Sequence, residues 1–220
     1  MEPKMEQERK QQNKTKVMAI SDIHGDTSFV KKLAEKAKKE NVDVIIIAGD
    51  ITFFEIETKN LIGPLLESKK PILLLPGNHE SPSTTSFLAN KYNINHLHGN
   101  YFIHNNVAFF GAGGATSGPF FTPESEIYNL LKKSNDTINS QKFKNQITKK
   151  VMITHMHASG TIIEKIANFA PSSEVIRKAI ENFKPDIAIS GHIHESAGLE
   201  DKIGKTRVIS VARKEVIFEI

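Results

Sequence analysis

The chain has 220 residues, of which 39% are hydrophobic and 25% are charged, and its formal net charge is +4 at pH 7. This composition excludes a largely disordered chain, and no apolar run reaches the roughly 18 residues of a membrane span. The chain has no cysteine. Disulfides, thiolate catalysis and thiolate zinc sites are therefore excluded, and any metal must be held by nitrogen and oxygen ligands.

The N-terminal residues are mostly polar and lack the apolar core of a secretory signal. We expect a flexible charged tail over residues 1–15, then a single domain over residues 16–220 and a cytoplasmic protein. The positive charge is local, because residues 1–16 carry +2 and residues 132–150 carry +5, which leaves −3 for the rest. Whole-chain charge is therefore weak evidence for nucleic-acid binding.

The first 80 residues predict a strand–helix–strand–helix–strand unit. Three apolar runs are typical of buried strands, at residues 17–20, 42–48 and 72–75. Between the first two, apolar residues recur on one helical face over residues 28–39, and a shorter helix is expected at residues 61–67. This order indicates parallel strands joined by right-handed crossovers.

The second half predicts short strands mixed with helices. Strand-like runs lie at residues 96–97, 101–103, 107–110, 151–154 and 187–189. Helices are expected from Pro123 to about residue 133 and after Ser172 or Ser173, with an exposed polar excursion over residues 134–150. Residues 206–211 and 215–220 are interpreted as a hairpin. The whole predicts an α/β fold with two facing sheets and helices outside.

Five short blocks of metal-seeking side chains each follow a predicted strand directly. They are Asp22-x-His24, Gly49-Asp50, Gly77-Asn78-His79-Glu80, His155 and Gly191-His192-Ile193-His194. Each block alone has an ordinary interpretation as a turn, a helix cap or a structural histidine. Together they lie at the carboxyl ends of strands, which is the edge where open parallel sheets bind ligands. Carboxylate, amide and imidazole groups gathered there indicate a site for two divalent metal ions.

In the order and spacing of these blocks, residues 16–220 resemble the calcineurin-like metallophosphoesterase superfamily, and among them the small uncapped archaeal and bacterial phosphodiesterase-like proteins. The resemblance implies a four-layer αββα sandwich, with two mixed β-sheets flanked by helices. It implies one metal held by Asp22, His24, Asp50 and His194. It implies a second metal held by Asp50, Asn78, His155 and His192, with Asp50 as the bridge and His79 as the catalytic histidine.

The reaction implied is hydrolysis of a phosphate ester, in which a hydroxide bridging the two metals attacks phosphorus in line. Asn78, His79 and His157 are the expected substrate-binding residues, although a surface position is the alternative for His157. These ligand types suit Mn, Fe, Zn, Ni or Co, and we expect Mn first. The expected partner is a phosphate-ester substrate. The sequence supports neither a membrane nor a nucleic acid as partner, and it leaves the oligomeric state, a homodimer included, open.

One position departs from many phosphoprotein phosphatases of this superfamily, which have an acidic residue three places after the bridging aspartate. That position is Phe53 here, so the usual partner of His79 is missing, and Glu55 and Glu80 are the candidates to replace it. The departure favours a phosphodiesterase over a protein phosphatase. The alternatives are a phosphomonoesterase and a low-activity protein-interaction scaffold on the same fold.

Two further features each have two interpretations. The pairs Phe53-Phe54 and Phe120-Phe121 either wall a substrate cleft or pack in the core, and core packing is the commoner role of aromatic clusters. The lysines of residues 132–150 either steer phosphate-bearing partners or belong to a solvated loop, which is the simpler interpretation.

Overall fold

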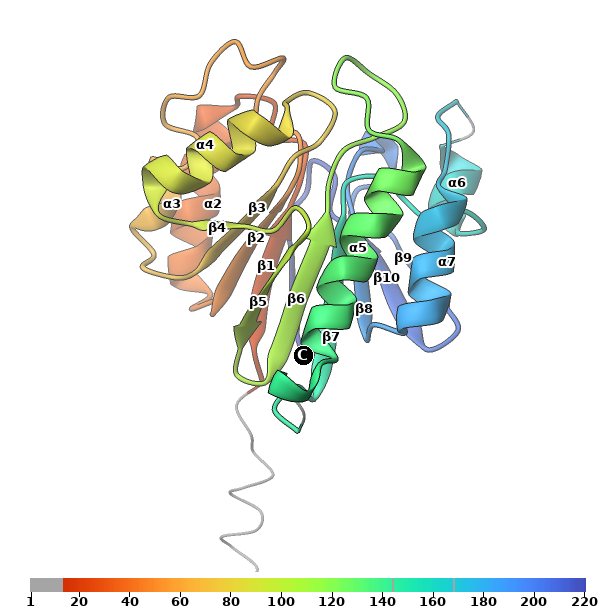
Figure 1. Cartoon of the computed structure of the whole chain (residues 1–220). Helices are drawn as coiled ribbons and strands as arrows, with labels where there is room; N and C mark the ends of the chain where they lie inside the picture. The colour runs from red at the N-terminus through yellow and green to blue at the C-terminus, as the bar shows by residue number, and fades with distance from the viewer. Residues whose placement is uncertain (1–13, 144, 168) are drawn as a thin grey trace, which may run out of the picture.

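Two β-sheets lie face to face at the centre of the computed structural model, which describes residues 14–220 except 144 and 168 (Figure 1). The first sheet has the order β11-β1-β2-β3-β4 and the second the order β5-β6-β7-β8-β10-β9. Helices cover the outer face of each sheet (Figure 1). The predicted αββα sandwich is confirmed. The predicted tail lies outside the described residues, except for Lys14 and Thr15.

The first sheet consists of β1 (Lys16–Ile20), β2 (Val44–Ala48), β3 (Ile72–Leu75), β4 (Asn95–His96) and β11 (Val216–Glu219). Strands β1 to β4 are parallel and β11 is antiparallel to β1. The second sheet consists of β5 (Asn100–His104), β6 (Val107–Ala112), β7 (Lys149–Thr154), β8 (Ile187–Ser190), β9 (Glu200–Ile203) and β10 (Thr206–Ser210). Its four central strands are parallel, and antiparallel β5 and β9 form the edges.

The helices are α2 (Thr27–Lys39), α3 (Gly63–Leu66), α4 (Pro82–Tyr92), α5 (Glu124–Ile138), α6 (Ile162–Ile166) and α7 (Glu174–Phe183), with short 3₁₀ turns η1 (Gln141–Phe143) and η2 (His194–Ser196). Apolar residues of α2, α3 and α4 pack on the outer face of the first sheet. Those of α5, α6 and α7 pack on the outer face of the second. None of the described helices has the length and apolar character that crossing a lipid bilayer requires.

Alternation of side chains along the strands explains the four layers. In β6, Phe109 points into the core between the two sheets, whereas its neighbour Phe110 points into the core under the helices. In β1, Val17 and Ala19 face the other sheet, and Met18 faces the outer helices. Both faces of the central strands are therefore buried, which is why these strands are nearly continuous apolar runs.

Helices α4, α5 and α6 and strand β9 differ from the sequence-based predictions. Helix α4 was not predicted, because it buries only Thr85, Leu88 and Ala89 and so has no apolar stripe. Helix α5 continues to Ile138, past its predicted end, and buries Ser134 and Asn135 in what was expected to be an exposed excursion. The short helix α6 and the charged strand β9 were also not predicted.

The predicted C-terminal hairpin is wrong. Strand β10 pairs with β8 and β9, while β11 pairs with β1 in the other sheet. The chain crosses between the sheets at residues 211–213, where the Val211 amide donates to Ser190 and the Arg213 amide donates to Ser21. This crossing joins the ends of β1 and β8, and it brings Arg213 beside the loop that follows β1.

We predict that Phe109→Ala lowers the free energy of unfolding by about 3–5 kcal/mol, because it leaves a cavity between the two sheets where relaxation is limited. Phe87 on α4 is 56% exposed and provides the matched control. Phe87→Ala is expected to change stability by less than about 0.5 kcal/mol. Urea denaturation followed by circular dichroism measures both. Equal losses in the two variants would contradict the assignment of Phe109 to a core between the sheets.

Candidate functional site

The five sequence blocks meet at one end of the sandwich, although they come from both sheets. Asp22 and His24 follow β1, Asp50 follows β2, and Asn78 and His79 follow β3. His155 follows β7 directly, and His192 and His194 follow β8. All the residues predicted to hold metal fall into three groups or lie beside them, and in each group the potential ligand atoms are within 4.8 Å of one another.

The first group contains Asp22, His24 and His194. The Asp22 Oδ1 atom lies 3.5 Å from His194 Nε2 and 3.8 Å from His24 Nε2. The two histidine Nε2 atoms are 3.2 Å apart, so at most one of them carries a hydrogen between them. Asp22 Oδ1 and the Nε2 atoms of His24 and His194 thus converge on one point.

The second group contains Asp50, His155 and His192. The His155 Nε2 atom lies 3.3 Å from Asp50 Oδ2 and 3.1 Å from the side-chain oxygen of Asn78. On the other side of its ring, His155 Nδ1 donates to the Ala48 carbonyl at 2.9 Å. That hydrogen bond fixes the ring so that Nε2 points at Asp50, as is usual for a metal-ligating histidine.

Asp50 connects the groups. It also belongs to a third group with His24 and His79, whose Nε2 atoms both lie 3.9 Å from Asp50 Oδ2. The other oxygen, Oδ1, accepts the His79 backbone N–H at 2.8 Å. Asp22 is arranged in the same way, since its Oδ2 accepts the His192 N–H at 2.9 Å and its Oδ1 faces the histidines. In each carboxylate a backbone N–H holds one oxygen and leaves the other for the cluster.

The backbone at these positions is unusual. Asp22, His24, Asp50 and His192 all have left-handed φ angles, between 50° and 71°. Non-glycine residues adopt this region at a cost, and they persist in it where the surroundings determine the geometry, often at functional sites. Four such residues in one cluster indicate that the strand ends are bent to aim these side chains.

Glycine permits the close approach of the β2 and β3 ends. A Cβ atom on Gly77 would lie 2.0 Å from Asp50 Oδ1 and 2.5 Å from the Asp50 nitrogen. On Gly49, whose φ is +93°, it would lie 2.5 Å from His155 Nδ1. The glycines before Asp50 and Asn78 are therefore required by packing around the carboxylate.

The pKa values of the cluster histidines are shifted in opposite directions. Although burial opposes the charged form of His155, the Asp50 carboxylate outweighs it and raises the pKa of His155 to about 10. Burial also opposes the charged form of Asp50, but the neighbouring His155 keeps the pKa of that carboxyl below its usual value. Burial, with the charge of His155, lowers the pKa of His192 to about 4. Two buried carboxylates thus face imidazoles of which His155 is favoured in its charged form and His192 in its neutral form.

These residues fit divalent cations. Asp22 Oδ1, the oxygen that faces the histidines, is buried without a hydrogen-bond partner among the described residues. Buried polar atoms rarely stay unpaired, and ion ligation is one usual explanation. Carboxylate, amide and imidazole donors match the nitrogen and oxygen ligands of Mn, Fe, Zn, Ni and Co.

Among the described residues, neither acid that was a candidate partner for His79 forms a hydrogen bond or ion pair with its ring. Glu80 is fully buried, and its carboxylate accepts hydrogen bonds from the backbone N–H groups of Gly77 and Thr52. Burial and the nearby Asp50 charge raise the pKa of Glu80 to about 7. Glu55 instead accepts the Ser81 N–H at the start of α4. The rings that contact His79 include Phe54, stacked at a centroid distance of 4.2 Å, and His24, edge to face at 4.5 Å.

A cavity of about 460 Å³ opens over the cluster. Its lining residues are His24, Asp50, Phe53, Asn78, His79, His192, His194 and Arg213. Arg213 was not predicted, because only the crossing between the sheets brings it here. Its Nη1 atom donates to the carbonyl of Asp22 at 3.1 Å. Phe53 and Phe54 are exposed rather than packed in the core, and so is Phe121.

His157 is the predicted substrate-binding residue that does not line this cavity. It is fully buried, which excludes the surface position considered for it, and neither ring nitrogen has a hydrogen-bond partner among the described residues. Burial lowers the pKa of His157 to about 4. Its contact with substrate stays a prediction.

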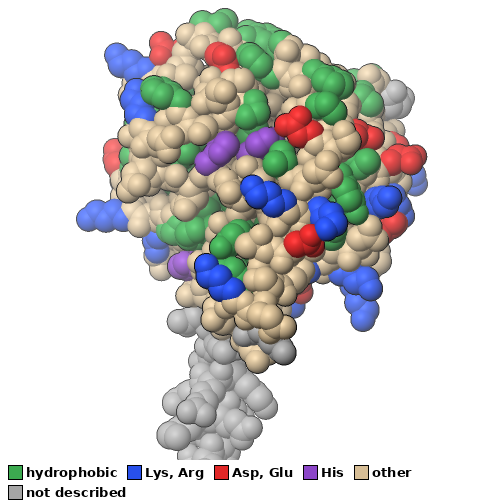
Figure 2. Space-filling view, viewed as in Figure 1, with side chains coloured by type: hydrophobic (Ala, Val, Ile, Leu, Met, Phe, Trp, Pro, Cys, Tyr) green, Lys and Arg blue, Asp and Glu red, His purple; other side chains and the backbone are tan. Residues whose placement is uncertain are grey.

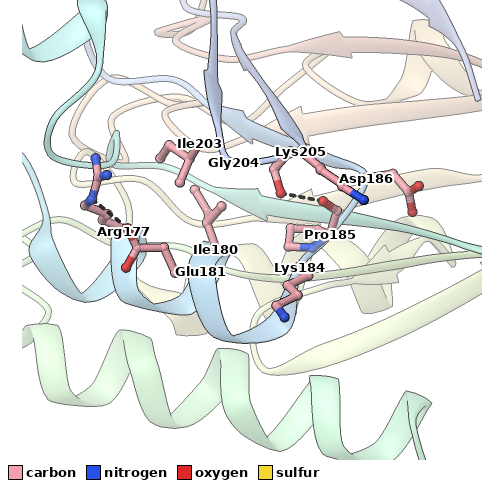
Figure 3. A pocket seen from close by; sticks show the side chains of 10 residues that line it. Arg177, Ile180, Glu181, Lys184, Pro185, Asp186, Ile203, Gly204 and Lys205 are labelled. Atoms are coloured by element: carbon pink, nitrogen blue, oxygen red, sulfur yellow. Dashed lines mark hydrogen bonds and ion pairs between the residues drawn. The ribbon is translucent and has the colours of Figure 1, made fainter.

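A second cavity, of about 580 Å³, lies between the end of α7 and the turn joining β9 to β10 (Figure 3). Arg177 and Glu181 form an ion pair at one end of it, and Lys184 and Lys205 lie at the other end (Figure 3). None of the residues predicted to bind metal or substrate lines this cavity. The candidate site is therefore the smaller cavity.

Comparison with known proteins agrees with the geometry. Over residues 15–196 the chain matches the family described as calcineurin-like phosphoesterase. No curated protein sequence matches it. A solved structure from Thermus thermophilus is 14% identical, has a TM-score of 0.71, and covers 94% of this chain and 99% of its own. Because such identity is low, this likeness shows the fold alone.

Two other solved structures have the same fold. A dimetal phosphatase from Danio rerio is 12% identical, with a TM-score of 0.55 and coverage of 89% of this chain and 86% of that one. An archaeal phosphodiesterase is 15% identical, with a TM-score of 0.50 and coverage of 93% of this chain and 99% of that one.

We predict that Gly77→Ala weakens Mn²⁺ binding by about tenfold or more, because its Cβ would displace the Asp50 carboxylate. Isothermal titration calorimetry of the metal-depleted protein measures the effect. Gly63→Ala is the matched control, since a Cβ there meets nothing within 4 Å. A Gly77→Ala protein that is folded and binds Mn²⁺ like the unmodified chain would contradict the role of Asp50 in the metal cluster.

Proposed function

The chain belongs to the calcineurin-like phosphoesterase family, and from this premise we propose that it is a two-metal phosphoester hydrolase that cleaves phosphodiesters. The observation that carries the proposal is the cluster of Asp22 and Asp50 with imidazoles from both sheets under one open cavity, which Asp50 and four histidines line. Each carboxylate has one oxygen held by a backbone N–H and one directed at the cluster.

The proposed ligands divide into two sets that share Asp50. Asp22, His24, Asp50 and His194 would hold one divalent cation, and Asp50, Asn78, His155 and His192 would hold the other. When bound, the cations supply positive charge opposite the phosphoryl oxygens and lower the pKa of a water molecule. Mn²⁺ is the cation that we would test first.

The protein residues then have distinct tasks. The two proposed ligand sets contain two carboxylates, so the loaded cavity has an excess of positive charge and attracts an anionic phosphate ester. His79 lies beside the proposed ligands, with its Nε2 atom 3.9 Å from the shared Asp50 carboxylate. We assign it as the group that donates a proton to the departing ester oxygen. Arg213 lines the same cavity and adds a fixed positive charge.

One observation favours a diester over a monoester. The position three residues after Asp50 holds Phe53, so the cavity has an apolar side chain where an acid is common in phosphoprotein phosphatases. A diester has a second organic substituent that can contact this apolar wall, and a monoester does not.

The single domain over residues 16–220 and the cytoplasmic location stay predictions from the sequence.

We predict that the Mn²⁺-loaded protein hydrolyses bis(p-nitrophenyl) phosphate with a kcat/KM about tenfold above that for p-nitrophenyl phosphate. Release of p-nitrophenolate measures both reactions. Preference for the monoester would overturn the phosphodiesterase assignment while keeping a phosphoesterase. No hydrolysis of either compound with Mn, Fe, Zn, Ni or Co would overturn the enzyme proposal and favour an interaction scaffold on this fold.

We predict that Asp50→Asn and His79→Gln each lower kcat/KM by about 100-fold or more, for different reasons. Asp50→Asn removes the carboxylate shared by both ligand sets, so the amount of bound Mn²⁺ falls with the activity. His79→Gln removes the proton donor, so activity falls while bound Mn²⁺ is retained. His104→Gln, at the end of β5, is the control and leaves both quantities unchanged. Full activity in His79→Gln would exclude proton donation by this residue.

A further inference from the structure

Two adjacent phenylalanines are exposed beside the cavity, on the loop that follows β2. Phe53 is 48% exposed and lines the cavity, and Phe54 is 43% exposed. Other large apolar side chains exposed on nearby strand-end loops include Ile56 and Phe121. In Figure 2, hydrophobic side chains gather along the upper end of the molecule, where Figure 1 has the loops after β2 and β6. Exposed apolar clusters of this kind mark binding surfaces.

The backbone under these rings is strained and firmly held. Phe54 and Glu55 have consecutive left-handed φ angles of 52° and 61°. On one side, the Thr52 N–H and hydroxyl both donate to the buried Glu80 carboxylate, at 3.0 Å each. On the other side, Glu55 accepts the Ser81 N–H at 2.7 Å. Strain that persists because hydrogen bonds impose it, in a turn that exposes two aromatic rings, indicates a functional purpose for the rings.

The two rings have different neighbours. Phe54 stacks on His79 with an interplanar angle of 27°, so His79 occupies one face of the Phe54 ring. Phe53 meets Phe54 edge to face at 4.5 Å and lies 5.5 Å from the His79 ring and 6.1 Å from the His24 ring. Phe54 therefore supports both His79 and Phe53, while Phe53 keeps an exposed surface next to the metal cluster.

Phe53 is also chemically distinct from its surroundings. Among the described residues that line the cavity it is the one apolar side chain, and the others are histidines, Asp50, Asn78 and Arg213. A phosphodiester held at the cluster has one ester arm that leaves near His79 and a second, retained arm within the cavity that Phe53 lines. A flat ring on that second arm can stack on Phe53, and aromatic side chains bind nucleobases in this way whatever their sequence.

We propose that Phe53 is a specificity-determining residue that stacks on a planar aromatic group of the substrate, so that the preferred phosphodiesters carry a nucleobase or an aryl ring on the retained ester arm. This inference rests on the proposed phosphodiester hydrolysis and specifies its substrate class. Phe54 acts as a positioning residue, because it contacts His79 and Phe53 but does not line the cavity.

The test uses substrates that share one leaving group and differ in the retained arm. Thymidine 5′-(p-nitrophenyl phosphate) carries a nucleobase, phenyl p-nitrophenyl phosphate carries a directly attached ring, and ethyl p-nitrophenyl phosphate carries neither. We expect the Mn²⁺-loaded protein to prefer at least one aromatic substrate to the ethyl ester by about tenfold in kcat/KM. Comparison of the two aromatic substrates distinguishes a nucleobase from a simple aryl group.

Phe53→Leu keeps an apolar side chain but removes the ring, and it is expected to lower the preference for the aromatic arm by about tenfold. Phe87→Leu makes the same change at an exposed phenylalanine of α4 outside the cavity, and leaves the preference unchanged. Because Phe53 is half exposed, its replacement should not unfold the protein, and circular dichroism checks this. A preference absent from the unmodified protein, or unchanged in Phe53→Leu, overturns the proposal.

A binding measurement separates this inference from the proposed function. If none of the three esters is hydrolysed, the hydrolase proposal fails, and stacking is tested alone by calorimetry with thymidine 5′-monophosphate and 2-deoxyribose 5-phosphate. The base-containing ligand is expected to bind about tenfold more tightly, and Phe53→Leu should remove that difference. Equal affinities for the two ligands in the unmodified protein would overturn the role of Phe53.

Discussion

The Asp50 carboxylate is the group on which the rest of the site depends. It is buried, with one oxygen fixed by the His79 N–H and the other within 4 Å of three histidine nitrogens. A buried charge is tolerated only where hydrogen bonds and opposite charge compensate its lost hydration. The compensation comes from the loop after β3 and from β7, so the same interaction joins both sheets. Gly77 follows from this constraint, because a side chain there would occupy the carboxylate's own space.

The positions of the proposed metal ligands could be predicted from sequence because each ligand block directly follows its strand in the chain. Apolar runs identify the parallel strands, each run ends in a polar block, and parallel strands bring their carboxyl ends to one edge. The position of Arg213 could not be predicted, because it depends on a crossing between the sheets that pairs β10 with β8 and β11 with β1. Helix α4 was missed because its buried side is short and partly polar. The exposure of Phe53 was missed because aromatic pairs are usually core residues.

Glu80 illustrates how sequence proximity misleads about chemistry. It is the neighbour of His79 in the chain, yet its side chain turns away and accepts the N–H groups of Gly77 and Thr52. It therefore ties the loop after β3 to the loop after β2. In doing so it fixes two things at once, the Gly77 turn that holds Asp50 and the strained turn that carries Phe53. Glu80, one of the two candidate partners of His79, instead supports the proposed metal ligands and the cavity wall.

The proposed metal ligands lie at strand ends, whereas the residues proposed to contact the organic part of the substrate lie on loops. This difference explains what the sequence motifs can and cannot predict. Proposed metal ligands lie at strand ends, where the sheet pairing restricts their positions, and five blocks suffice to indicate the chemistry. Recognition of the organic part of the substrate falls to loop residues such as Phe53, whose neighbours on the loop contact other parts of the chain. Loops on a rigid scaffold vary independently of it. Members of one fold can therefore share a set of metal ligands while differing in substrate. In this chain, Phe53 is the one apolar side chain among the described residues that line the cavity.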